Sequence, residues 1–457
     1  SRGPKKSEMM NPGLNSYESE SAQLAHTTFN NQIFRKITLR FIPLLFVCYV
    51  LNYMDRTNIG FAQLQMRADL GLSDVAYGFG AGMFFVSYSL FALPSNLLLT
   101  KIGARRTIFG SLFGWGLTSS ATMLIHTPMQ FYALRFLLGV VEAGFFPGII
   151  YYFGEWYPSD RRAKVIGIFT SATVVAGIVS GLMSGGIMTY LDGFSGLRGW
   201  QWMFLIEGLP SAAMGIAVFF YLDDGPEEAK WLSDWEKGKL LALLEEDAAA
   251  SQTSRTLRKA LSDWHVYLLG LIYFLAVFDT FVLAFWQPEM IQSFGVSSVM
   301  AIGIYSTIPP IAAVIAKVYV GYHSDRKKEL RWHFAVPALA GALGFSVMML
   351  LPHNVAWGIA CLTLATAGVH GCIPVIWAAP GQYLSGVGAA GGIAVISMMG
   401  TMSGAVGPAL LGFMKGTTGN FTYGMYTLSA ILTLAVILML ALVRNSNRTV
   451  SATVPSD

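Results

Sequence analysis

The chain has 457 residues, of which 54% are hydrophobic and only 12% are charged, and its mean hydropathy is +0.53. Soluble globular chains carry about 25% charged residues, and this deficit runs along the whole length, so the composition excludes a soluble protein. The net charge of +4 is too small to indicate nucleic-acid binding. Cys48, Cys361 and Cys372 lie inside apolar runs, which predicts free thiols and neither disulfides nor a metal site.

Twelve runs of residues are long and apolar enough to cross a bilayer, for which about 20 residues are needed. Lipid leaves the edges of an open sheet unsatisfied, and the runs are too continuous for barrel strands, so an all-α membrane protein is predicted. The first six runs are 38–60, 76–99, 107–126, 129–153, 163–191 and 201–222, and the second six are 265–288, 299–323, 334–352, 355–380, 388–415 and 422–443.

The long polar stretch between the sixth and seventh runs divides the chain into two bundles. The predicted parts are a tail (1–36), a six-helix bundle (37–222), a linker with a short amphipathic helix (223–262), a second bundle (263–444) and a tail (445–457). The first 36 residues hold no apolar core, so no cleavable signal is expected. Lys and Arg gather in the linker and in the loops after spans two, four and eight, whereas the other side holds mainly Arg67, Arg198 and Lys415. This asymmetry predicts that the linker and both termini are cytoplasmic.

The two halves repeat related motifs in the same order. Span two ends in "LLLTKIGARR" and span eight in "VYVGYHSDRKK", while spans four and ten carry "AGFFPG" and "HGCIPV". Duplicated halves with a site at their interface are typical of alternating-access transporters.

The sequence "GYHSDRKK" resembles the cytoplasmic loop signature of the major facilitator superfamily, in which Gly321, Asp325 and Arg326 would form a conformational latch. Thr100 replaces the acid in the first-half copy. With "NYMDRTNIGFA", "GARR", "RFLLGVVEAGFFPG" and "GWQWMFLIEGLP", the chain resembles the anion:cation symporter family from residue 35 to 443. The resemblance implies two pseudo-symmetric six-helix bundles that carry an organic acid with a proton or another cation. Members carry D-galactonate, tartrate, phthalate and 4-hydroxyphenylacetate.

Ionisable residues inside spans are costly and point to function. Asp55 and Arg56 are placed at the extracellular end of span one, where they form either an interface pair or a proton-linked switch. Arg135 and Glu142 share one face of span four, about 10.5 Å apart. Arg135 is either a snorkelling cation or a bidentate carboxylate ligand, and Glu142 either a structural acid or a proton carrier. The resemblance implies that Asp55 and Glu142 couple protons and that Arg56 and Arg135 are their associated arginines.

Asp279 in span seven is unusual for the family. Four roles stay open: it hydrogen-bonds a substrate hydroxyl, pairs with a cation, binds a second proton, or is satisfied by neighbouring residues. It should disfavour a second negative charge on the substrate unless it is protonated. His370 is either a core residue or part of the pathway. Lys317 is interpreted as snorkelling to the cytoplasmic surface and Glu207 as structural. Ser397 and Thr401 stand where relatives carry amides, which leaves fewer donors for a polyhydroxylated ligand. Several aromatic side chains could hold a ring, namely Tyr53, Tyr88, Phe281, Trp286 and Trp377.

These observations predict a monomeric, proton-coupled uptake symporter for a small organic carboxylate, with a lean towards an aromatic acid, in the bacterial inner membrane among lipids. An exporter or anion exchanger on the same fold is the first alternative, and a membrane receptor that does not transport is the second. No cofactor is expected: the glycine-rich stretch 388–407 suits close helix packing and not nucleotide binding. An enzyme is least favoured, since no nucleophile with a base, metal cluster or phosphate loop is visible.

Overall fold

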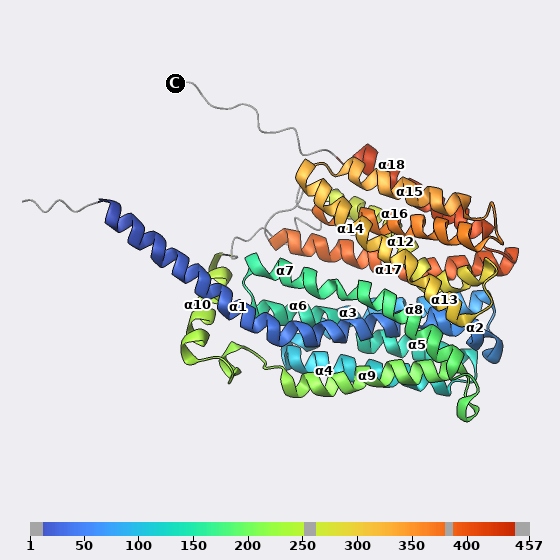
Figure 1. Cartoon of the computed structure of the whole chain (residues 1–457), viewed down its shortest axis with the longest axis horizontal. Coiled ribbons are helices and arrows are strands. Elements are labelled where there is room, and N and C mark those ends of the chain that lie inside the picture. Colours follow the sequence, from blue (N-terminus) through green and yellow to red (C-terminus); the bar gives the residue numbers. More distant parts are fainter. Residues whose placement is uncertain (1–11, 251–261, 380–386, 444–457) are drawn as a thin grey trace, which may run out of the picture.

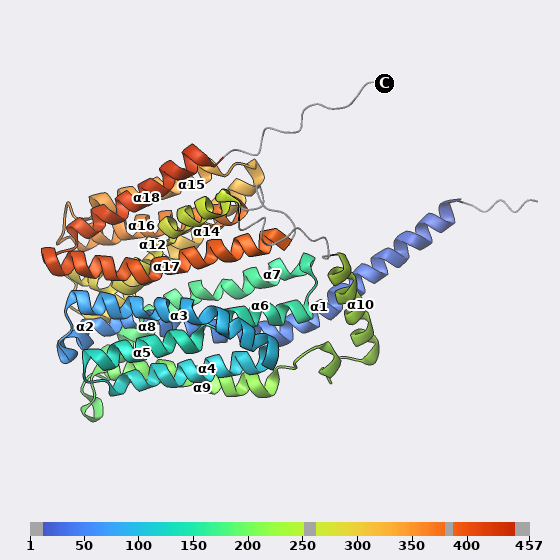
Figure 2. The same cartoon turned by 180° about the vertical axis from the view of Figure 1, so that it is seen from behind.

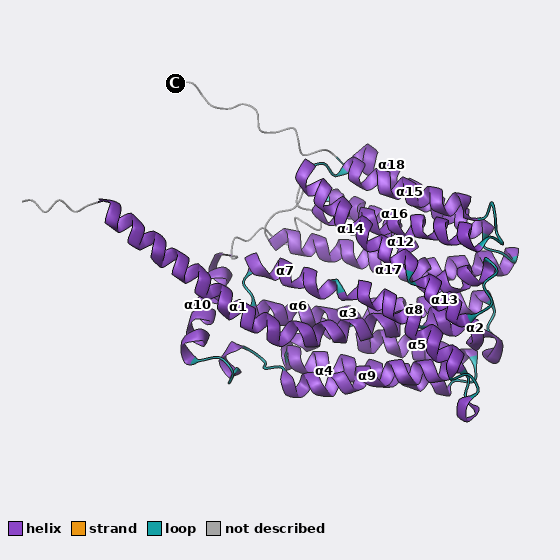
Figure 3. Ribbon diagram, in the orientation of Figure 1, coloured by secondary structure: helices purple, strands orange, loops and turns teal. Residues whose placement is uncertain are grey.

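The computed structural model describes residues 12–250, 262–379 and 387–443, which form helices and loops and contain no strand. Within these residues, ten helical segments are long and apolar enough to cross a membrane. Two shorter helices, α4 (Ala104–Ala121) and α15 (Arg331–Met348), pack beside α9 and α16 and bring the bundle to the predicted twelve spans. Figures 1 and 3 show the spans running side by side along the long axis of the molecule.

The first half of the chain forms six of these spans, and three of them are broken into two helices. The breaks lie at Asn58, at Ala143–Gly144 and at Ser171. The spans are α1 (Pro12–Thr57) with α2 (Ile59–Leu70), α3 (Asp74–Ile102), α4, α5 (Pro128–Glu142) with α6 (Phe145–Trp156), α7 (Ser159–Thr170) with α8 (Ala172–Tyr190), and α9 (Gly199–Tyr221).

The second half forms the other six spans, of which the second is broken at Thr307. Figure 2 shows this half stacked on the first, with α17 beside α3. The spans are α12 (Trp264–Ser293), α13 (Val299–Ser306) with α14 (Ile308–Lys327), α15, α16 (Val355–Ala378), α17 (Val387–Thr418) and α18 (Thr422–Leu442).

The linker forms helix α10 (Asp234–Ala250) at one end of the bundle, as Figure 1 shows. We call this the linker end and the opposite end the loop end. Lys36 of α1 binds Glu236 of α10 at 3.0 Å, which ties the linker to the first span. Several predicted features lie outside the described residues, namely the tail 445–457, residues 1–11 and the basic linker positions Arg255, Arg258 and Lys259.

Glycines let the two halves approach closely towards the loop end. A Cβ atom on Gly78 of α3 would lie 2.5 Å from the carbonyl oxygen of Pro408 on α17, and one on Gly82 would lie 2.5 Å from that of Ala405. On the opposite side of the interface, a Cβ on Gly181 of α8 would lie 2.7 Å from the carbonyl oxygen of Gly303 on α13. Small residues permit this backbone contact between helices in a membrane.

Candidate functional site

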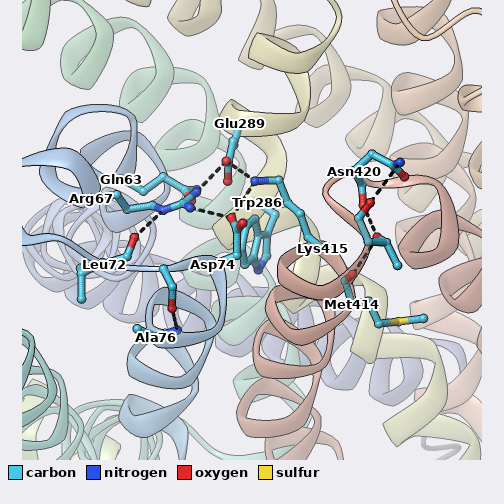
Figure 4. A network of polar contacts seen from close by, with 12 residues as sticks. Gln63, Arg67, Leu72, Asp74, Ala76, Trp286, Glu289, Met414, Lys415 and Asn420 are labelled. Carbon is cyan, nitrogen blue, oxygen red and sulfur yellow. Dashed lines mark hydrogen bonds and ion pairs between the residues drawn. The ribbon is translucent and has the colours of Figure 1, made fainter.

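Four charged side chains close the interface at the loop end. Arg67 of α2 contacts Asp74 of α3 at 2.6 Å and Glu289 of α12 at 2.7 Å, and Lys415 of α17 lies 2.6 Å from both acids. Figure 4 shows the two cations and the two acids alternating, with Trp286 beside Asp74 and Lys415. Two of these contacts, Arg67–Glu289 and Lys415–Asp74, join one half of the protein to the other. We call Arg67, Asp74, Glu289 and Lys415 the loop-end cluster.

Asp55 lies in the middle of span one, so its predicted position at the outer end of the span is wrong. The span continues through α2 to Leu70, about 22 Å further along the axis. The polar residues of α2 do not end the span because neighbouring helices satisfy them. Gln63, for example, donates through Nε2 to the carbonyl oxygen of Phe285 at 2.7 Å.

The carboxylate of Asp55 accepts three hydrogen bonds inside the first half. The donors are Trp115 Nε1 at 2.9 Å, Ser119 Oγ at 2.9 Å and Ser211 Oγ at 2.6 Å. The expected pairing of Asp55 with Arg56 is not formed, because successive residues of a helix point about 100° apart. Asp55 therefore faces α4 and α9, while Arg56 faces α5.

Arg56 forms its ion pair with Glu142, through two hydrogen bonds from Nε and Nη2 to Oε1. Arg56 precedes the break at Asn58, and Glu142 is the last residue of α5 before the break at Ala143. Glu142 is only 2% exposed, whereas the side chain of Arg56 keeps 20% of its surface and lies over the rings of Phe84 and Tyr88. Chain breaks thus bring a buried acid and a partly accessible cation together in mid-membrane.

Arg135 is buried, and no carboxylate among the described residues forms an ion pair with it. It is 3% exposed, and its Nε and Nη2 atoms have no hydrogen-bond partner in the described part of the chain. Its guanidinium lies 5.2 Å from the ring centre of Phe84 on α3 and 5.7 Å from that of Phe285 on α12. A cation buried at this depth against aromatic faces is costly and marks a position of functional interest.

A cavity of about 130 Å³ lies between the halves, on the linker side of the loop-end cluster. Its polar wall includes Tyr53 and Thr57 of α1 and Ser180 of α8. The second half contributes Thr280 and Gln287 of α12, Ser306 of α13, Lys317 of α14, and Thr366 and His370 of α16. The rest of the wall is apolar, mainly Phe61, Val174, Leu283, Ala284 and Val314. Such a mixed wall suits a small polar ligand.

Comparison with known proteins agrees with this architecture. The family model of the Major Facilitator Superfamily matches residues 45–408. The chain belongs to the Major Facilitator Superfamily. It is 42% identical to a putative tartrate transporter of Agrobacterium vitis, over 92% of this chain and 97% of that protein. It is 38% identical to a quinolone resistance transporter of Acinetobacter baumannii, over 90% and 94%. The inward open xylose transporter XylE from E. coli shares the fold, with a TM-score of 0.73 at 14% identity, over 91% and 98%.

The superfamily consists of transporters, so this multi-pass membrane protein is a transporter and not an enzyme. In that frame, the cavity at the interface of the two halves is where a substrate of an alternating-access carrier would bind. Two of the residues predicted to bind substrate, Tyr53 and His370, line it.

The other predicted substrate residues lie elsewhere. Asp279 is fully buried, neither of its carboxylate oxygens has a hydrogen-bond partner among the described residues, and it is not part of the cavity wall. Trp286 packs under the loop-end cluster and donates to the carbonyl oxygen of Pro408 at 3.2 Å. Trp377 packs against Tyr273, with the ring centres 4.8 Å apart. Arg56 and Arg135, also predicted to bind substrate, are likewise not part of the cavity wall. Outside the wall are also Tyr88, which lies beside Arg56, and Ser397 and Thr401, which share a hydrogen bond within α17.

The residues of the predicted latch lie at the linker end of α14. Asp325 and Arg326 are exposed, and no ion pair joins either of them to another described residue. Gly321 faces Pro374 of α16, where an added Cβ would lie 3.5 Å from its Cβ. The hydrogen bonds and ion pairs recorded between the halves of the described chain lie instead towards the loop end, at Gln63, Tyr77 and the loop-end cluster.

Sequence reasoning missed three groups of polar residues. Trp115, Ser119 and Ser211 surround Asp55 but come from distant positions and carry no charge to attract notice. Lys317 was interpreted as snorkelling, yet it lines the cavity. The loop-end cluster had one signal in the sequence: Arg67 and Lys415 are rare cations on their side, and each needs a nearby acid.

Proposed function

We propose that the protein is a proton-coupled symporter that carries a small organic carboxylate into the bacterial cell across the inner membrane. The linker end then faces the cytoplasm together with both termini, and the loop end faces outwards. The similarity to a tartrate transporter supports an organic acid as the substrate. Protons and the organic anion are the expected ligands, and the working unit is a monomer in lipid.

The observation that carries this proposal is the buried pair of Glu142 and Arg56. A carboxylate at this depth is tolerated because the guanidinium neutralises it. When Glu142 takes up a proton, the pair loses its Coulomb attraction, and Arg56 becomes free to bind a substrate carboxylate. Arg135, with no acid of its own, is the second cation available to that carboxylate. Proton and substrate therefore bind together, which is the requirement for symport.

Asp55 is proposed as a second proton site. It is buried away from Arg56, and three neutral groups donate hydrogen bonds to its carboxylate. When the carboxyl is protonated, one of the two serine hydroxyl groups can rotate and accept a hydrogen bond from it, so the same neighbours bind both forms. Unlike Glu142, it has no cation to release, so its protonation would alter the packing of α1 against α4 and α9.

Purified protein in liposomes tests the coupling. With an inward proton gradient, the wild type should accumulate one or more acids from a panel of sugar acids, aromatic acids and dicarboxylates. Glu142→Gln should keep counterflow of the same acid and lose accumulation driven by the gradient. Glu155→Gln, an acid further along the same span, is the matched control and should accumulate normally. Normal accumulation by Glu142→Gln would contradict the coupling role.

The alternative of an organic-anion exporter or exchanger is favoured by the similarity to the quinolone resistance transporter. An exchanger would show counterflow in the same liposomes that does not respond to the imposed proton gradient. An exporter would release substrate from loaded liposomes faster when the proton gradient is directed inwards. Either result would separate exchange or export from uptake.

A further inference from the structure

Asp279 of α12 is a buried acid to which the proposed symport gives no role. It is 0% exposed, and neither carboxylate oxygen has a hydrogen-bond partner among the described residues. No ion pair joins it to a cation in the described part of the chain. An ionised carboxylate in such surroundings loses its hydration without compensation, so the group takes up a proton instead. Asp279 is therefore protonated in this arrangement of the helices.

The helices packed against α12 bring no opposite charge to Asp279. Cys372 of α16, a buried free cysteine, is the titratable side chain that interacts with it. Helices α13 and α18 contain no charged residue. The charged and histidine side chains that the structure describes on α2, α12, α16 and α17 are held elsewhere: Arg67, Glu289 and Lys415 in the loop-end cluster, Asp69 by Trp200, His265 by Asp263, and His370 by Thr366.

The first half contains an equivalent of Asp279. Where α2 crosses α12, a Cβ atom on Gly60 would lie 3.0 Å from the carbonyl oxygen of Ala284. The residue numbers 60 and 284 differ by 224. In a carrier built from two related halves, the residues that meet where the first and seventh spans cross are each other's equivalents. This contact predicts that a residue of the first half corresponds to the residue 224 positions later.

A second pair of contacts has the same spacing. An added Cβ on Gly82 of α3 would lie 2.5 Å from the carbonyl oxygen of Ala405 on α17, and one on Gly181 of α8 would lie 3.5 Å from the Cβ of Ser306 at the end of α13. Positions 82 and 306 differ by 224, and so do positions 181 and 405. Each contact is therefore the image of the other, and the spacing holds across the interface.

Asp55 and Asp279 are also 224 positions apart. Each lies five residues, about 7.5 Å, before the crossing of Gly60 and Ala284, so the two acids lie at the same depth. Asp55 accepts three hydrogen bonds, whereas Asp279 accepts none from the described residues. Even when protonated, a carboxyl group without partners leaves its O–H and C=O groups unsatisfied, so Asp279 does not stabilise this arrangement. Costly ionisable residues inside spans point to function.

We propose that Asp279 is a proton site of the second half, equivalent to Asp55 in the first, and that the carrier moves one proton through it in each cycle. This inference rests on the proposed function, in which Glu142 and Asp55 already take up protons. Thr280, the next residue, lines the cavity, so a rotation of α12 brings the carboxyl group to water in the cavity. There the O–H bond of Asp279 breaks, the proton passes to water, and the carboxylate becomes hydrated.

Infrared spectroscopy of the purified protein in lipid tests whether Asp279 holds a proton. A protonated carboxyl group has a C=O stretching band at higher frequency than the bands of a carboxylate. At neutral pH, Asp279→Asn should lose one such band relative to the wild type. Asp192→Asn removes an exposed acid that pairs with Arg198 and should lose carboxylate bands only. Unchanged carboxylic-acid bands in Asp279→Asn would mean that Asp279 is ionised and would overturn the inference.

Transport at balance tests whether this proton moves. Liposomes held at zero membrane potential accumulate the acid until net flux stops, and the logarithm of the accumulation ratio then rises with the pH difference with a slope equal to the number of protons carried. Asp279→Asn should lower this slope by one proton. Asp279→Glu keeps the acid and should keep the slope, as should Asp192→Asn. Counterflow shows that a variant is folded, and Asp279→Thr, which is also neutral, replaces Asp279→Asn if that variant shows none.

The outcomes separate this inference from the proposed function. An unchanged slope in the neutral variant, with normal accumulation by the wild type, would make Asp279 a structural acid, overturn the inference and leave the proposed function intact. A wild type whose accumulation does not respond to the proton gradient would overturn both. A slope that falls by one proton, together with the loss of the carboxylic-acid band, is the expected result.

Discussion

Substitution of Glu289 by Gln should loosen the loop end. Glu289 contacts Arg67 at 2.7 Å and Lys415 at 2.6 Å, and the four side chains of the loop-end cluster keep between 13% and 19% of their surface. The variant loses the Arg67–Glu289 contact between the halves, while Lys415–Asp74 remains. The open and closed arrangements of the loop end should therefore become closer in free energy.

The size of the effect follows from the burial of the pair. Exposed ion pairs contribute about 0–1 kcal/mol and broken buried pairs cost about 3–5 kcal/mol. A pair with 13–19% of its surface exposed lies between these limits, at about 1–2 kcal/mol, which shifts the ratio of the two states about 5- to 30-fold. If the loop-end open state is a minor species in the wild type, a shift of this size makes it measurable.

Electron–electron distance measurements can detect the shift. Ala68 on α2 and Ser297 before α13 are exposed and lie at the loop end of opposite halves, and replacing both by Cys gives sites for spin labels. The native cysteines are buried. The wild type should give mainly the short distance, and Glu289→Gln should add a longer one.

A control pair lies within one half. Asp192→Asn weakens the Arg198–Asp192 contact of 3.6 Å, which does not cross the interface, and should leave the distances unchanged. A distance distribution for Glu289→Gln that equals the wild type, in the presence and absence of substrate, would refute a gating role for the cluster.

Two further predictions concern packing and pH. Gly82→Ala should increase the population of the loop-end open state, because a Cβ there would lie 2.5 Å from the Ala405 carbonyl oxygen. The same spin labels measure it, and an unchanged distance distribution would show that α17 shifts to accommodate the methyl group. Glu329 lies between α14 and α15, and although burial raises its pKa, the N–H groups of Trp332 and His333 and the His333 ring hold the pKa below its usual range. It therefore stabilises the fold above pH ~4.3, and this is lost as the pH falls through the lowered pKa. Glu329→Gln should cost about 0.5–1 kcal/mol at pH 7, seen as a lower Tm in detergent, and the difference from the wild type should vanish towards pH 3.

The spans could be predicted from the sequence because lipid imposes the same demand on every one of them. Each must satisfy its backbone internally and present an apolar surface, so length and composition locate it. This logic failed at α2, where Gln63, Arg67 and Asp69 suggested a loop. Other helices bind the Gln63 amide nitrogen and the charges of Arg67 and Asp69, and hydropathy cannot distinguish a polar residue that is bound by protein from one that is bound only by water.

The candidate site could be predicted only in part, because it depends on which helices meet. Glu142 and Arg56 stood out as charges within spans, but their pairing links positions 86 residues apart. The partners of Asp55 are more remote still, since Ser211 is 156 residues away. Neutral donors such as Trp115 and Ser211 carry no signal of their own in a chain rich in serine and aromatic residues. Lys317 was visible, but its orientation into the cavity was not.

Helix α12 connects the two ends of the proposed cycle. It carries Thr280 and Gln287 in the cavity wall and Glu289 in the loop-end cluster, and Phe285 between them accepts hydrogen bonds from Gln63 and Tyr77 of the first half. A substrate that binds in the cavity therefore contacts α12, the same helix that the loop-end cluster holds against the first half.

This arrangement separates affinity from gating in the two sets of variants. A ligand shifts an equilibrium only through its different affinity for the two states. His370→Phe removes a polar group from the cavity wall, so it should change the ratio of the KM values for two acids of the panel and leave the distances of the substrate-free protein unchanged. Glu289→Gln changes the populations of the states and touches no ligand group, so it should move the distances and scale both KM values by the same factor. A changed KM ratio in Glu289→Gln would mean that the cluster reaches into the binding site, and the division of roles along α12 would have to be abandoned.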